Sequence, residues 1–474
     1  MTSRFGRLCA NLVPFAACAF VLSVAPAAAS PGAAAGARDA EAPGGSIPRY
    51  VIHVSVDGLR GDAVPRLGPA NVPHFYRMIV EGASTDNART DFDYTITLPN
   101  HACQLTSRPV LGAEGHGLSY NSDDGRTLEL IHGSYVAGVF DVAHDNGLGT
   151  ALYTSKSKFA LFDRSWNESN GAPDATGDDD GRDKIDTYLY SAATEALIDS
   201  FVAHSTAAPA RYSFIHLVDP DAVGHSAGWE SGAYFDSVIK VDGLIGRIFD
   251  LATHNPLLEG KTWIVVTADH GGIAKDHSNA LLAANYTVPM FVWGPGVPPG
   301  TDLYYLSAAT RLDPNSGSPP YSVTPQPIRN GEAANLALYL LGLGAVPGSS
   351  ITAEQDNDPL PPAGAAPPPR VALPRPQSGA ALEHPASVTI EAMAETEGGA
   401  IQYVEFFANY VKLGESSAVP YSFEWSGMAP GPYRITARAV RDDGIGAVAS
   451  VDIEVVSTAD VPEGHSSLPL PPRL

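Results

Sequence analysis

The chain has 474 residues, of which 44% are hydrophobic, so it is long enough to form one large domain and a smaller one, each with its own core. Aspartate and glutamate outnumber lysine and arginine by 52 to 29, which gives a formal net charge of -23. Nucleic-acid scaffolds and proteins that bind anionic membranes normally show the opposite balance, so we expect neither class. Acidity of this kind fits an exported protein and one that holds divalent cations.

The first 29 residues are typical of a secretory signal peptide. Arg4 and Arg7 form a basic start, residues 8–25 are apolar, and small residues lead to a cleavage site after Ala29. A membrane anchor is the alternative, but a proline inside the short apolar run favours cleavage. No later stretch reaches the ~20 apolar residues that span a bilayer. We therefore expect an exported protein, periplasmic or extracellular, with no membrane span once the signal is removed.

Removal of this signal would leave Cys103 as the only cysteine, so the mature chain cannot form an internal disulfide. A catalytic thiol is one alternative for Cys103. The formylglycine pattern of sulfatases, however, requires a proline two residues later, where this chain has Leu105. We therefore expect a buried cysteine that packs as a small apolar side chain.

Residues 30–48 are mainly alanine, glycine and proline, which predicts a flexible leader. Between residues 49 and 348, apolar runs rich in β-branched and aromatic residues alternate with helix-length segments. Buried strands are predicted over residues 50–56, 149–155, 212–218, 262–268 and 288–294. Because strands that alternate with helices usually pair in parallel, we expect an α/β domain with a mostly parallel sheet flanked by helices.

The remainder of the chain has a different composition. Residues 349–385 are rich in proline, which predicts a semi-rigid linker. Residues 386–458 alternate apolar and polar side chains between turn residues spaced about 8 to 12 positions apart, the pattern of an all-β sandwich. Residues 459–474 are predicted to form a disordered tail.

Acidic and histidine residues follow three of the predicted strands. Asp57 follows the first strand, Asp221 and His225 follow the third, and Asp269 and His270 follow the fourth. Because parallel strands open their carboxyl ends onto one edge of the sheet, these side chains can converge there. Carboxylate oxygens and neutral imidazole nitrogens are the ligands of catalytic zinc and similar metals. The sequence therefore predicts a metal site at this edge.

Six motifs occur in one order: "VDGLRGD", "TLPNH", "HGLSYN", "PDAVGH", "TADHGG", and a histidine ahead of "VPMFVWGPG". Together they resemble the alkaline phosphatase superfamily, and within it the type I phosphodiesterase/nucleotide pyrophosphatase family. The resemblance extends from about residue 49 to residue 348. It implies an alkaline-phosphatase-like catalytic domain that hydrolyses phosphoric esters of small molecules.

The resemblance also implies two zinc ions, although other divalent metals are possible. One ion would be held by Asp57, Asp269 and His270, and the other by Asp221, His225 and His277. His277 matches the family's last ligand by its place ahead of "VPMFVWGPG". Its spacing after "DHGG" is shorter than the family usually shows.

Thr97 opens the motif "TLPNH", ahead of a helix predicted over residues 99–106. From the residues alone, Thr97 is either an ordinary helix cap or a nucleophile, and the nearby Thr95 is a rival hydroxyl. The family resemblance selects Thr97 as the nucleophile, which would pass through a phosphothreonine intermediate. It also implies that the side-chain amide of Asn121 contacts a phosphate oxygen and stabilises charge.

Lys156 and Lys158 bear on the choice of ester. Their alternate spacing after a predicted strand would put both on one face of an extended segment. A similar cationic pair occurs in threonine-type phosphomonoesterases and in phosphonoacetate hydrolase, where it meets additional negative charge on the substrate. A solvated loop is the plain alternative. The family favours phosphodiester or nucleotide pyrophosphate hydrolysis, with monoester or phosphonate hydrolysis as the alternative.

Two further segments carry expectations. The acidic run "DATGDDDGRDKID" over residues 174–186 lacks the register and terminal glutamate of a calcium loop, so we expect a solvated insertion. Residues 386–457 resemble bacterial immunoglobulin-like domains, through "VEFFANYVKLGE" and "PYSFEWSGMAPGPYRITARAVRDDGIGA". Such modules serve as spacers or bind carbohydrate or surface partners. A protein of another class, a non-catalytic surface binding protein that keeps the fold, is the remaining alternative.

Overall fold

The computed structural model describes residues 49–357, 359–360 and 366–457. The predicted signal peptide, leader and C-terminal tail lie outside these residues, so those expectations stay predictions. Within the described parts of the chain, no helix has both the length and the apolar character needed to cross a membrane.

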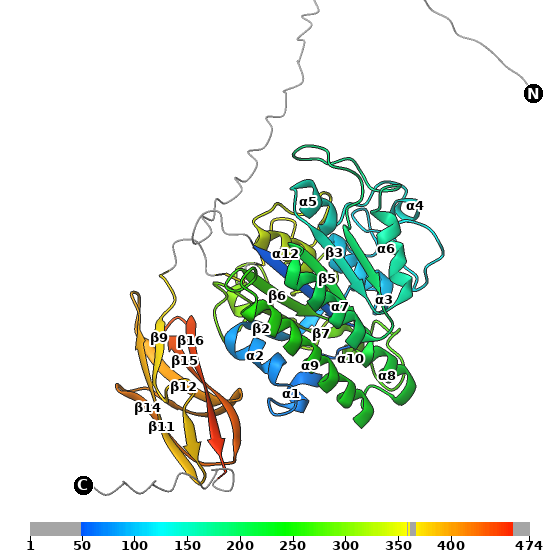
Figure 1. Cartoon of the computed structure of the whole chain (residues 1–474). Coiled ribbons are helices and arrows are strands. Elements are labelled where there is room, and N and C mark those ends of the chain that lie inside the picture. Colours follow the sequence, from blue (N-terminus) through cyan, green and yellow to red (C-terminus); the bar gives the residue numbers. More distant parts are fainter. Residues whose placement is uncertain (1–48, 358, 361–365, 458–474) are drawn as a thin grey trace, which may run out of the picture. The chain divides into compact units, whose positions relative to one another are not determined.

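An eight-stranded sheet dominates the first part of the structure, in the order β4-β3-β5-β1-β6-β7-β2-β8 (Figure 1). Its strands are β1 (Tyr50–Val56), β2 (Ala83–Arg89), β3 (Thr150–Thr154), β4 (Thr187–Tyr190), β5 (Tyr212–Leu217), β6 (Thr262–Thr267), β7 (Thr287–Trp293) and β8 (Thr301–Asp302). The five from β4 to β6 pair in parallel, whereas β7 runs antiparallel to both of its neighbours. The prediction of a mostly parallel sheet is confirmed.

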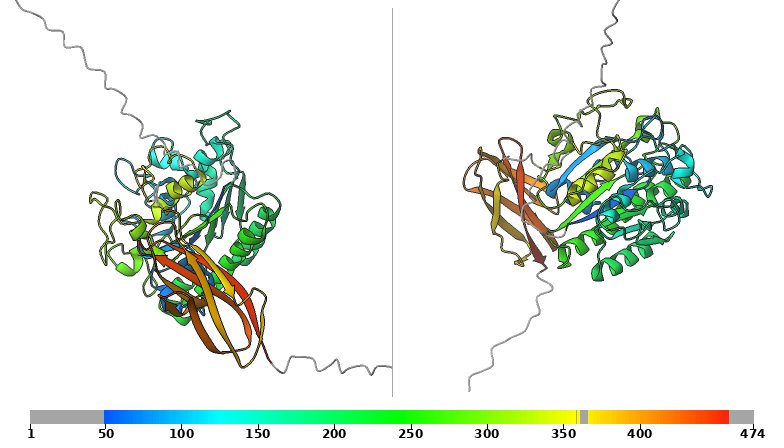
Figure 2. Two further views of the ribbon diagram at one scale, coloured as in Figure 1. Left: turned by 90° about the vertical axis from the view of Figure 1, so that its left-hand side faces the viewer. Right: turned by 90° about the horizontal axis from the view of Figure 1, so that it is seen from above.

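The central strands β1, β5 and β6 are buried along their whole length. Their β-branched and aromatic residues favour the extended backbone, and their apolar side chains on both faces require cover on both sides. That cover comes from two groups of helices that flank the sheet (Figures 1 and 2). The first comprises α2 (Pro73–Glu81), α7 (Thr194–Ala207) and α9 (Gly232–His254), and the second α3 (Thr97–Thr106), α5 (Val139–Asp145) and α12 (Ala333–Leu341).

Shorter helices connect these elements. They are α1 (Ala63–Leu67), α4 (Leu128–His132), α6 (Ala160–Ser165), α8 (Asp219–Ala227), α10 (Ala283–Tyr286) and α11 (Leu303–Leu306), with 3-10 turns η1 (Ser157–Phe159) and η2 (Asn330–Glu332). Helix α3 is buried along its whole length, and Cys103 within it is 0% exposed. The expectation of a buried cysteine is therefore met.

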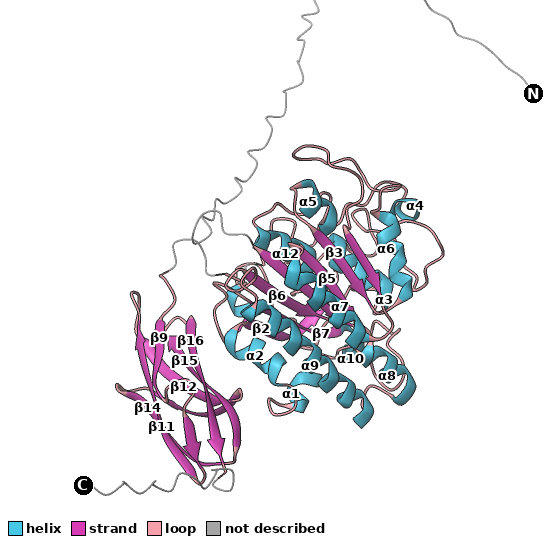
Figure 3. Cartoon of the chain, in the orientation of Figure 1, coloured by secondary structure: helices cyan, strands magenta, loops and turns pink. Residues whose placement is uncertain are grey.

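The C-terminal part is all-β, as expected for an immunoglobulin-like module (Figure 3). One sheet has the order β10-β16-β15-β12-β13 and the other β14-β11-β9. The strands are β9 (Arg370–Arg375), β10 (Ala381–Glu383), β11 (Ala386–Glu395), β12 (Ile401–Ala408), β13 (Val411–Ser416), β14 (Tyr421–Met428), β15 (Gly431–Arg441) and β16 (Gly446–Val456). Fully buried side chains such as Ile390, Val404 and Ile435 form a separate core.

The predicted linker over residues 349–385 contains regular structure, because both β9 and β10 lie within it. Val371 and Leu373 alternate along β9 and pack against the core of the C-terminal part. The strand tolerates Pro374 because β9 is an edge strand, where a missing N–H need not break a ladder. The proline-rich composition concealed this short alternation.

Candidate active site

The predicted metal ligands lie at the carboxyl ends of three neighbouring strands, β5, β1 and β6. Asp57 directly follows β1, and Asp269 and His270 follow β6 by two and three residues. Asp221 and His225 lie on α8, which begins just after β5. The main-chain N–H of Asp221 donates to the carbonyl oxygen of Asp57 at 3.0 Å, which ties the start of α8 to the end of β1. The expected convergence at one sheet edge is therefore observed.

The first cluster surrounds the imidazole of His270. Its Nε2 lies 3.5 Å from Asp57 Oδ1, 3.2 Å from Asp269 Oδ2 and 3.8 Å from Asp221 Oδ1. All four side chains are buried. Asp57, Asp221 and His270 offer ligand atoms that all lie within 4.8 Å of one another. The set predicted from the family resemblance contained Asp269 where this group contains Asp221. Asp221 therefore belongs to both clusters, whereas the prediction placed it in one.

The second cluster consists of Asp221, His225 and His277, whose ligand atoms also lie within 4.8 Å of one another. Asp221 Oδ1 is 3.3 Å from His225 Nε2 and 3.7 Å from His277 Nε2. The ring of His277 also stacks on that of His270, with centroids 3.5 Å apart. The structure thus brings His277 to the other ligands despite its short spacing after "DHGG".

Hydrogen bonds to the main chain orient the three imidazoles. Each Nδ1 faces a carbonyl oxygen: His225 to Lys275 at 3.1 Å, His270 to Gly271 at 2.8 Å, and His277 to Thr95 at 2.6 Å. Because a carbonyl only accepts, each Nδ1 carries a proton, and Nε2 is the nitrogen of each ring that is left to bind a cation. Two such nitrogens, of His225 and His277, lie 3.2 Å apart and would repel each other unless a cation lay between them.

Several buried polar atoms of the site have no hydrogen-bond partner among the described residues. They are Asp57 Oδ1, Asp221 Oδ1, Asp269 Oδ2 and His270 Nε2. Burial of unpartnered polar atoms is costly and is uncommon in native proteins. Divalent cations would give these atoms partners, and oxygen and imidazole donors are those that hold zinc. The residues therefore fit a metal centre.

The pKa shifts of the clustered residues also fit a metal centre. Burial opposes the ionisation of Asp57, but Lys156 and a hydrogen bond from His216 outweigh it and hold its pKa well below the usual range. Burial and the neighbouring charge of Asp57 raise the pKa of Asp269 well above its usual range. Burial lowers the pKa of His270 to about 3, which keeps this ring in the neutral form that binds metals.

Thr97 is the first residue of α3, and the residue at the N-cap position is Ile96, which makes no side-chain cap. The helix-cap interpretation of Thr97 is therefore wrong, because the helix begins one residue earlier than a threonine cap would require. The hydroxyl instead lies 3.4 Å from Lys156 Nζ. The rival hydroxyl of Thr95 donates to the carbonyl oxygen of His277, so it holds a predicted ligand in place.

Asn121 and the two lysines lie near the N-terminus of α3. Asn121 Oδ1 accepts from the main-chain N–H of Leu98 at 3.0 Å and from Lys158 Nζ at 2.7 Å. Because Oδ1 takes these donors, the Nδ2 group is the part of the amide that can donate to a phosphate oxygen. Lys156 Nζ lies 2.6 Å from both Asp57 Oδ2 and Asp221 Oδ2.

Neither lysine belongs to a solvated extended loop. The chain turns into η1 directly after Lys156, so the expectation of an extended segment with both lysines on one face is wrong. The two ammonium groups nevertheless reach the same site through different partners. Burial and the charge of Lys156 lower the pKa of Lys158 to about 8.

Two buried histidines of the site were not predicted as site residues. His216 lies on β5 and its Nε2 is 2.8 Å from Asp57 Oδ2. His101 bridges two elements, because its Nε2 lies 2.9 Å from Ser55 Oγ on β1 and its Nδ1 donates to Thr97 O at 2.8 Å. The available signal was a single imidazole inside an otherwise apolar run, as in "FIHLV".

Trp229 packs against the second cluster. Its indole N–H donates to Gly58 O at 2.9 Å, and its ring meets that of His225 edge-on at 5.0 Å. A Cβ added at Gly224 or Gly272 would lie 2.4 Å or 2.2 Å from this indole. Glycine at these positions therefore lets the indole ring pack against the segments that carry the predicted ligands.

The acidic run over residues 174–186 is organised around a buried cation of the chain itself. Lys184 is 0% exposed, and its Nζ contacts Asp174, lies 3.0 Å from Asp145 Oδ1 and donates to Gly181 O at 2.8 Å. The expectation of a merely solvated insertion is therefore wrong for its buried part. A lysine ammonium supplies the positive charge that a calcium loop would take from an ion.

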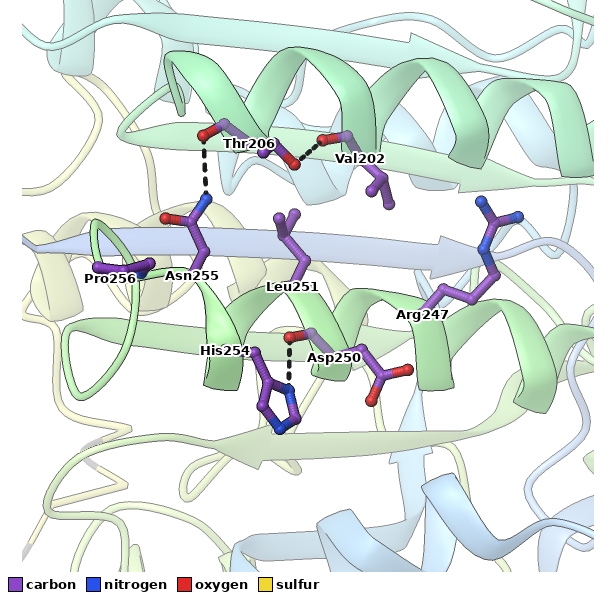
Figure 4. A pocket seen from close by; sticks show the side chains of 8 residues that line it. All are labelled: Val202, Thr206, Arg247, Asp250, Leu251, His254, Asn255 and Pro256. Carbon is purple, nitrogen blue, oxygen red and sulfur yellow. Dashed lines mark hydrogen bonds between the residues drawn. The ribbon is translucent and has the colours of Figure 1, made fainter.

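A groove of about 500 Å³ lies between α7 and α9 (Figure 4). It is lined by Val202, Thr206, Arg247, Asp250, Leu251, His254, Asn255 and Pro256. Six of them come from the C-terminal halves of α7 and α9, which lead into β5 and β6, and Asn255 and Pro256 follow α9 directly. The groove therefore lies toward the amino ends of the strands, at the opposite edge from the metal cluster.

Comparison with known proteins agrees with this geometry. Residues 132–290 match the type I phosphodiesterase/nucleotide pyrophosphatase family, and residues 369–437 match the bacterial Ig domain family. The second match begins next to β9, in agreement with the strand found inside the predicted linker.

Curated relatives match over shorter segments. Arylsulfatase K of Xenopus laevis is 29% identical over 85 residues, which cover 17% of this chain and 16% of that protein. GPI ethanolamine phosphate transferase 1 of Homo sapiens is 27% identical over 139 residues, which cover 27% of this chain and 14% of that protein. The chain therefore spans only a small part of the length of these relatives.

Solved structures are similar at low identity. Murine ectonucleotide pyrophosphatase/phosphodiesterase 5 is 16% identical, with a TM-score of 0.44, and the match covers 63% of this chain and 96% of that one. The fibronectin(III)-like modules of Clostridium thermocellum CbhA are 27% identical with a TM-score of 0.19, covering 21% of this chain and 53% of that one. On the family matches alone, residues 132–290 belong to a type I phosphodiesterase/nucleotide pyrophosphatase domain and residues 369–437 to a C-terminal bacterial Ig-like domain.

Proposed function

We propose that this chain is an exported hydrolase of phosphoric esters, of the phosphodiesterase/nucleotide pyrophosphatase type, that uses Thr97 as its nucleophile and depends on two zinc ions. The observation that carries the proposal is the set of unpartnered buried ligand atoms that converge at one sheet edge. The family match over residues 132–290 supports the same reaction class. The hydroxyl of Thr97, which makes no helix cap, supports its role as the attacking group.

The proposed ligands are the two predicted sets, with Asp57, Asp269 and His270 in one and Asp221, His225 and His277 in the other. When bound, the ions would supply Lewis-acid stabilisation of the negative charge on the attacking and leaving oxygens. The bare Nε2 atoms of the three imidazoles and the unpartnered carboxylate oxygens are suited to hold them.

The residues of the chain carry out the remaining steps. Thr97 Oγ1 loses its proton to solvent and forms a bond to phosphorus as the bond from phosphorus to the leaving oxygen breaks, and the leaving oxygen takes a proton from water. A water molecule later cleaves the phosphothreonine, which returns the Thr97 hydroxyl and releases the phosphoryl group as phosphate or its ester. Lys156, 3.4 Å from this hydroxyl, favours its deprotonated form by charge. Asn121 Nδ2 donates to a phosphate oxygen and stabilises charge in the transition state. The N-terminus of α3 favours the phosphoryl group through its dipole.

Phosphomonoester or phosphonate hydrolysis is the second candidate, and one contact favours it. Lys158 Nζ lies 2.7 Å from Asn121 Oδ1, so a second cation stands beside the amide proposed to bind phosphate. A monoester dianion carries one more negative charge than a diester, and a cation placed there would favour it. A non-catalytic surface binding protein is the alternative of a different class.

Turnover of bis-p-nitrophenyl phosphate and of p-nitrophenyl phosphate, with metal content measured on the same sample, tests these alternatives. The proposal expects two zinc ions per chain, faster diester turnover and loss of activity in chelator. Faster monoester turnover would support the second candidate. A folded, zinc-loaded protein with no turnover of either ester would support the binding protein instead.

Export and the role of the Ig-like domain complete the proposal. The predicted signal peptide supports secretion to the periplasm or the outside of the cell. The Ig-like domain would then act as a spacer or bind a carbohydrate or surface partner. Cell fractionation of the tagged full chain tests the first point, since a cytoplasmic product of full length would contradict it.

A further inference from the structure

We infer that His216 is a positioning residue for Asp57, and that it selects which carboxylate oxygen Asp57 presents to a metal ion. The inference rests on the proposed function, since it concerns the same metal centre. It assigns a task to a strand residue that lies outside both predicted ligand sets.

The direction of the hydrogen bond follows from the chemistry of its partners. His216 Nε2 lies 2.8 Å from Asp57 Oδ2. An ionised carboxylate has no proton to give, so Nε2 must be the donor. The other ring nitrogen, Nδ1, is then an acceptor and faces Ser155, whose Oγ lies 3.0 Å away and whose main-chain nitrogen lies 3.4 Å away.

The two oxygens of Asp57 consequently have different surroundings. Oδ2 receives both the His216 N–H and the Lys156 ammonium, the latter at 2.6 Å. Oδ1 has no hydrogen-bond partner among the described residues and lies 3.5 Å from His270 Nε2. The carboxylate is therefore held with one oxygen engaged and the other directed at the metal cluster.

Packing fixes the ring that makes this selection. His216 is 0% exposed on β5 and pairs in register with Ser55 on β1, two residues before Asp57. Phe159 and His101 pack against the imidazole, with ring centroids 4.4 Å and 5.0 Å away. The imidazole of His216 is held by two paired strands and two aromatic contacts. Because it has little room to rotate, it can fix the orientation of the Asp57 carboxylate. Outer partners of this kind typically contribute about 10- to 100-fold to metal affinity.

Zinc calorimetry on the chelator-stripped full chain tests the inference. We expect His216→Leu to weaken one of the two zinc-binding steps by about 10- to 100-fold and to leave the other step near the wild-type value. His216→Gln keeps an N–H donor and should recover part of the loss. His53→Leu is the matched control, because His53 is also fully buried on β1 but bonds Tyr212 at 3.0 Å, and its zinc affinity should not change.

The outcomes separate the inference from the proposed function. If the wild-type protein binds no zinc, the proposed function fails. If wild type binds two ions and folded His216→Leu binds them equally well, the inference fails alone. Equal losses in His216→Leu and His216→Gln would show that packing, not the hydrogen bond, is responsible, and would also overturn it.

A second variant covers the case in which His216→Leu does not fold, as judged by thermal unfolding and circular dichroism. Ser155→Ala keeps the imidazole but removes the hydroxyl that holds its Nδ1 side. We expect a smaller loss of affinity in the same zinc-binding step. An unchanged affinity in folded Ser155→Ala would contradict the inference.

Discussion

The ammonium of Lys156 lies 2.6 Å from a carboxylate oxygen of Asp221, inside the cluster of predicted metal ligands. It contacts Asp57 at the same distance, and its side chain is 17% exposed. Burial opposes its charge, but Asp57 and Asp221 outweigh the burial and raise the pKa of Lys156. Lys156 thus supplies the positive charge that holds these carboxylates together in the metal-free protein.

Lys156→Met should therefore destabilise the metal-free protein. Removing one partner of a buried ion pair leaves an uncompensated charge, which costs roughly 3–5 kcal/mol in the free energy of unfolding. Urea unfolding in the presence of chelator measures the loss, and added zinc should narrow the gap to wild type. Lys240→Met is the control, because its pairs with Glu195 and Asp219 are more exposed and are worth about 0–1 kcal/mol. Equal losses in the two variants would contradict the prediction.

Thr97→Ala should abolish turnover if this hydroxyl forms the phosphothreonine. We expect kcat to fall by at least about 1000-fold while the variant still binds zinc, since loss of a nucleophile removes the chemical step itself. Thr106→Ala is the matched control, because Thr106 is a buried threonine of the same helix whose hydroxyl bonds Ala102 O at 2.6 Å. Turnover by Thr97→Ala at the level of this control would exclude the covalent mechanism.

The charge of Lys158 predicts a pH dependence of monoester hydrolysis. With a pKa of about 8, Lys158 is cationic below that pH and becomes neutral as the pH rises through it. The attraction for a monoester dianion is therefore present below pH 8 and is lost above it. We expect kcat/KM for p-nitrophenyl phosphate to decline above pH 8 more steeply than for the diester. Lys158→Arg should remove the decline, and a decline that persists in that variant would have another origin.

Gly272→Ala should disturb the packing of Trp229 against the second cluster. A Cβ at this position would lie 2.2 Å from the indole of Trp229, and overpacking of this kind costs about 1–3 kcal/mol. The displaced ring should also weaken zinc binding, because Trp229 packs against His225. Gly243→Ala, on α9 with nothing within 4 Å of the added Cβ, should stabilise the protein slightly. Unchanged melting and zinc affinity in Gly272→Ala would contradict the prediction.

The parallel sheet explains why the convergence of the predicted metal ligands could be foreseen from sequence. Once residues 50–56, 212–218 and 262–268 were recognised as parallel strands, their carboxyl ends had to meet, so Asp57, Asp221 and Asp269 were expected together. How these carboxylates group into the two clusters depends on sheet geometry within a few ångströms. A one-dimensional pattern does not contain that information.

Other features escaped prediction because their signal was weak. A lone imidazole in an apolar strand, such as His216, has the same pattern as a histidine that is merely buried, such as His53. Only the position of the neighbouring strand separates the two. The strand β9 escaped because Pro374 and the prolines on either side of the strand outweighed a short alternation of Val371 and Leu373, although an edge position tolerates Pro374.

The hydrogen bond between Ser55 and His101 has a consequence for how this site can diversify. Ser55 lies two residues before Asp57 on β1, and His101 lies one turn after Thr97 on α3. This contact ties Thr97, the proposed nucleophile, to the strand that precedes Asp57, a proposed metal ligand, through side chains outside the loop that joins β2 to α3. That loop also holds His277 through Thr95, so the segments that can vary freely are the other loops around the site. Substrate preference can thus evolve in the surrounding loops while the reaction geometry stays constant.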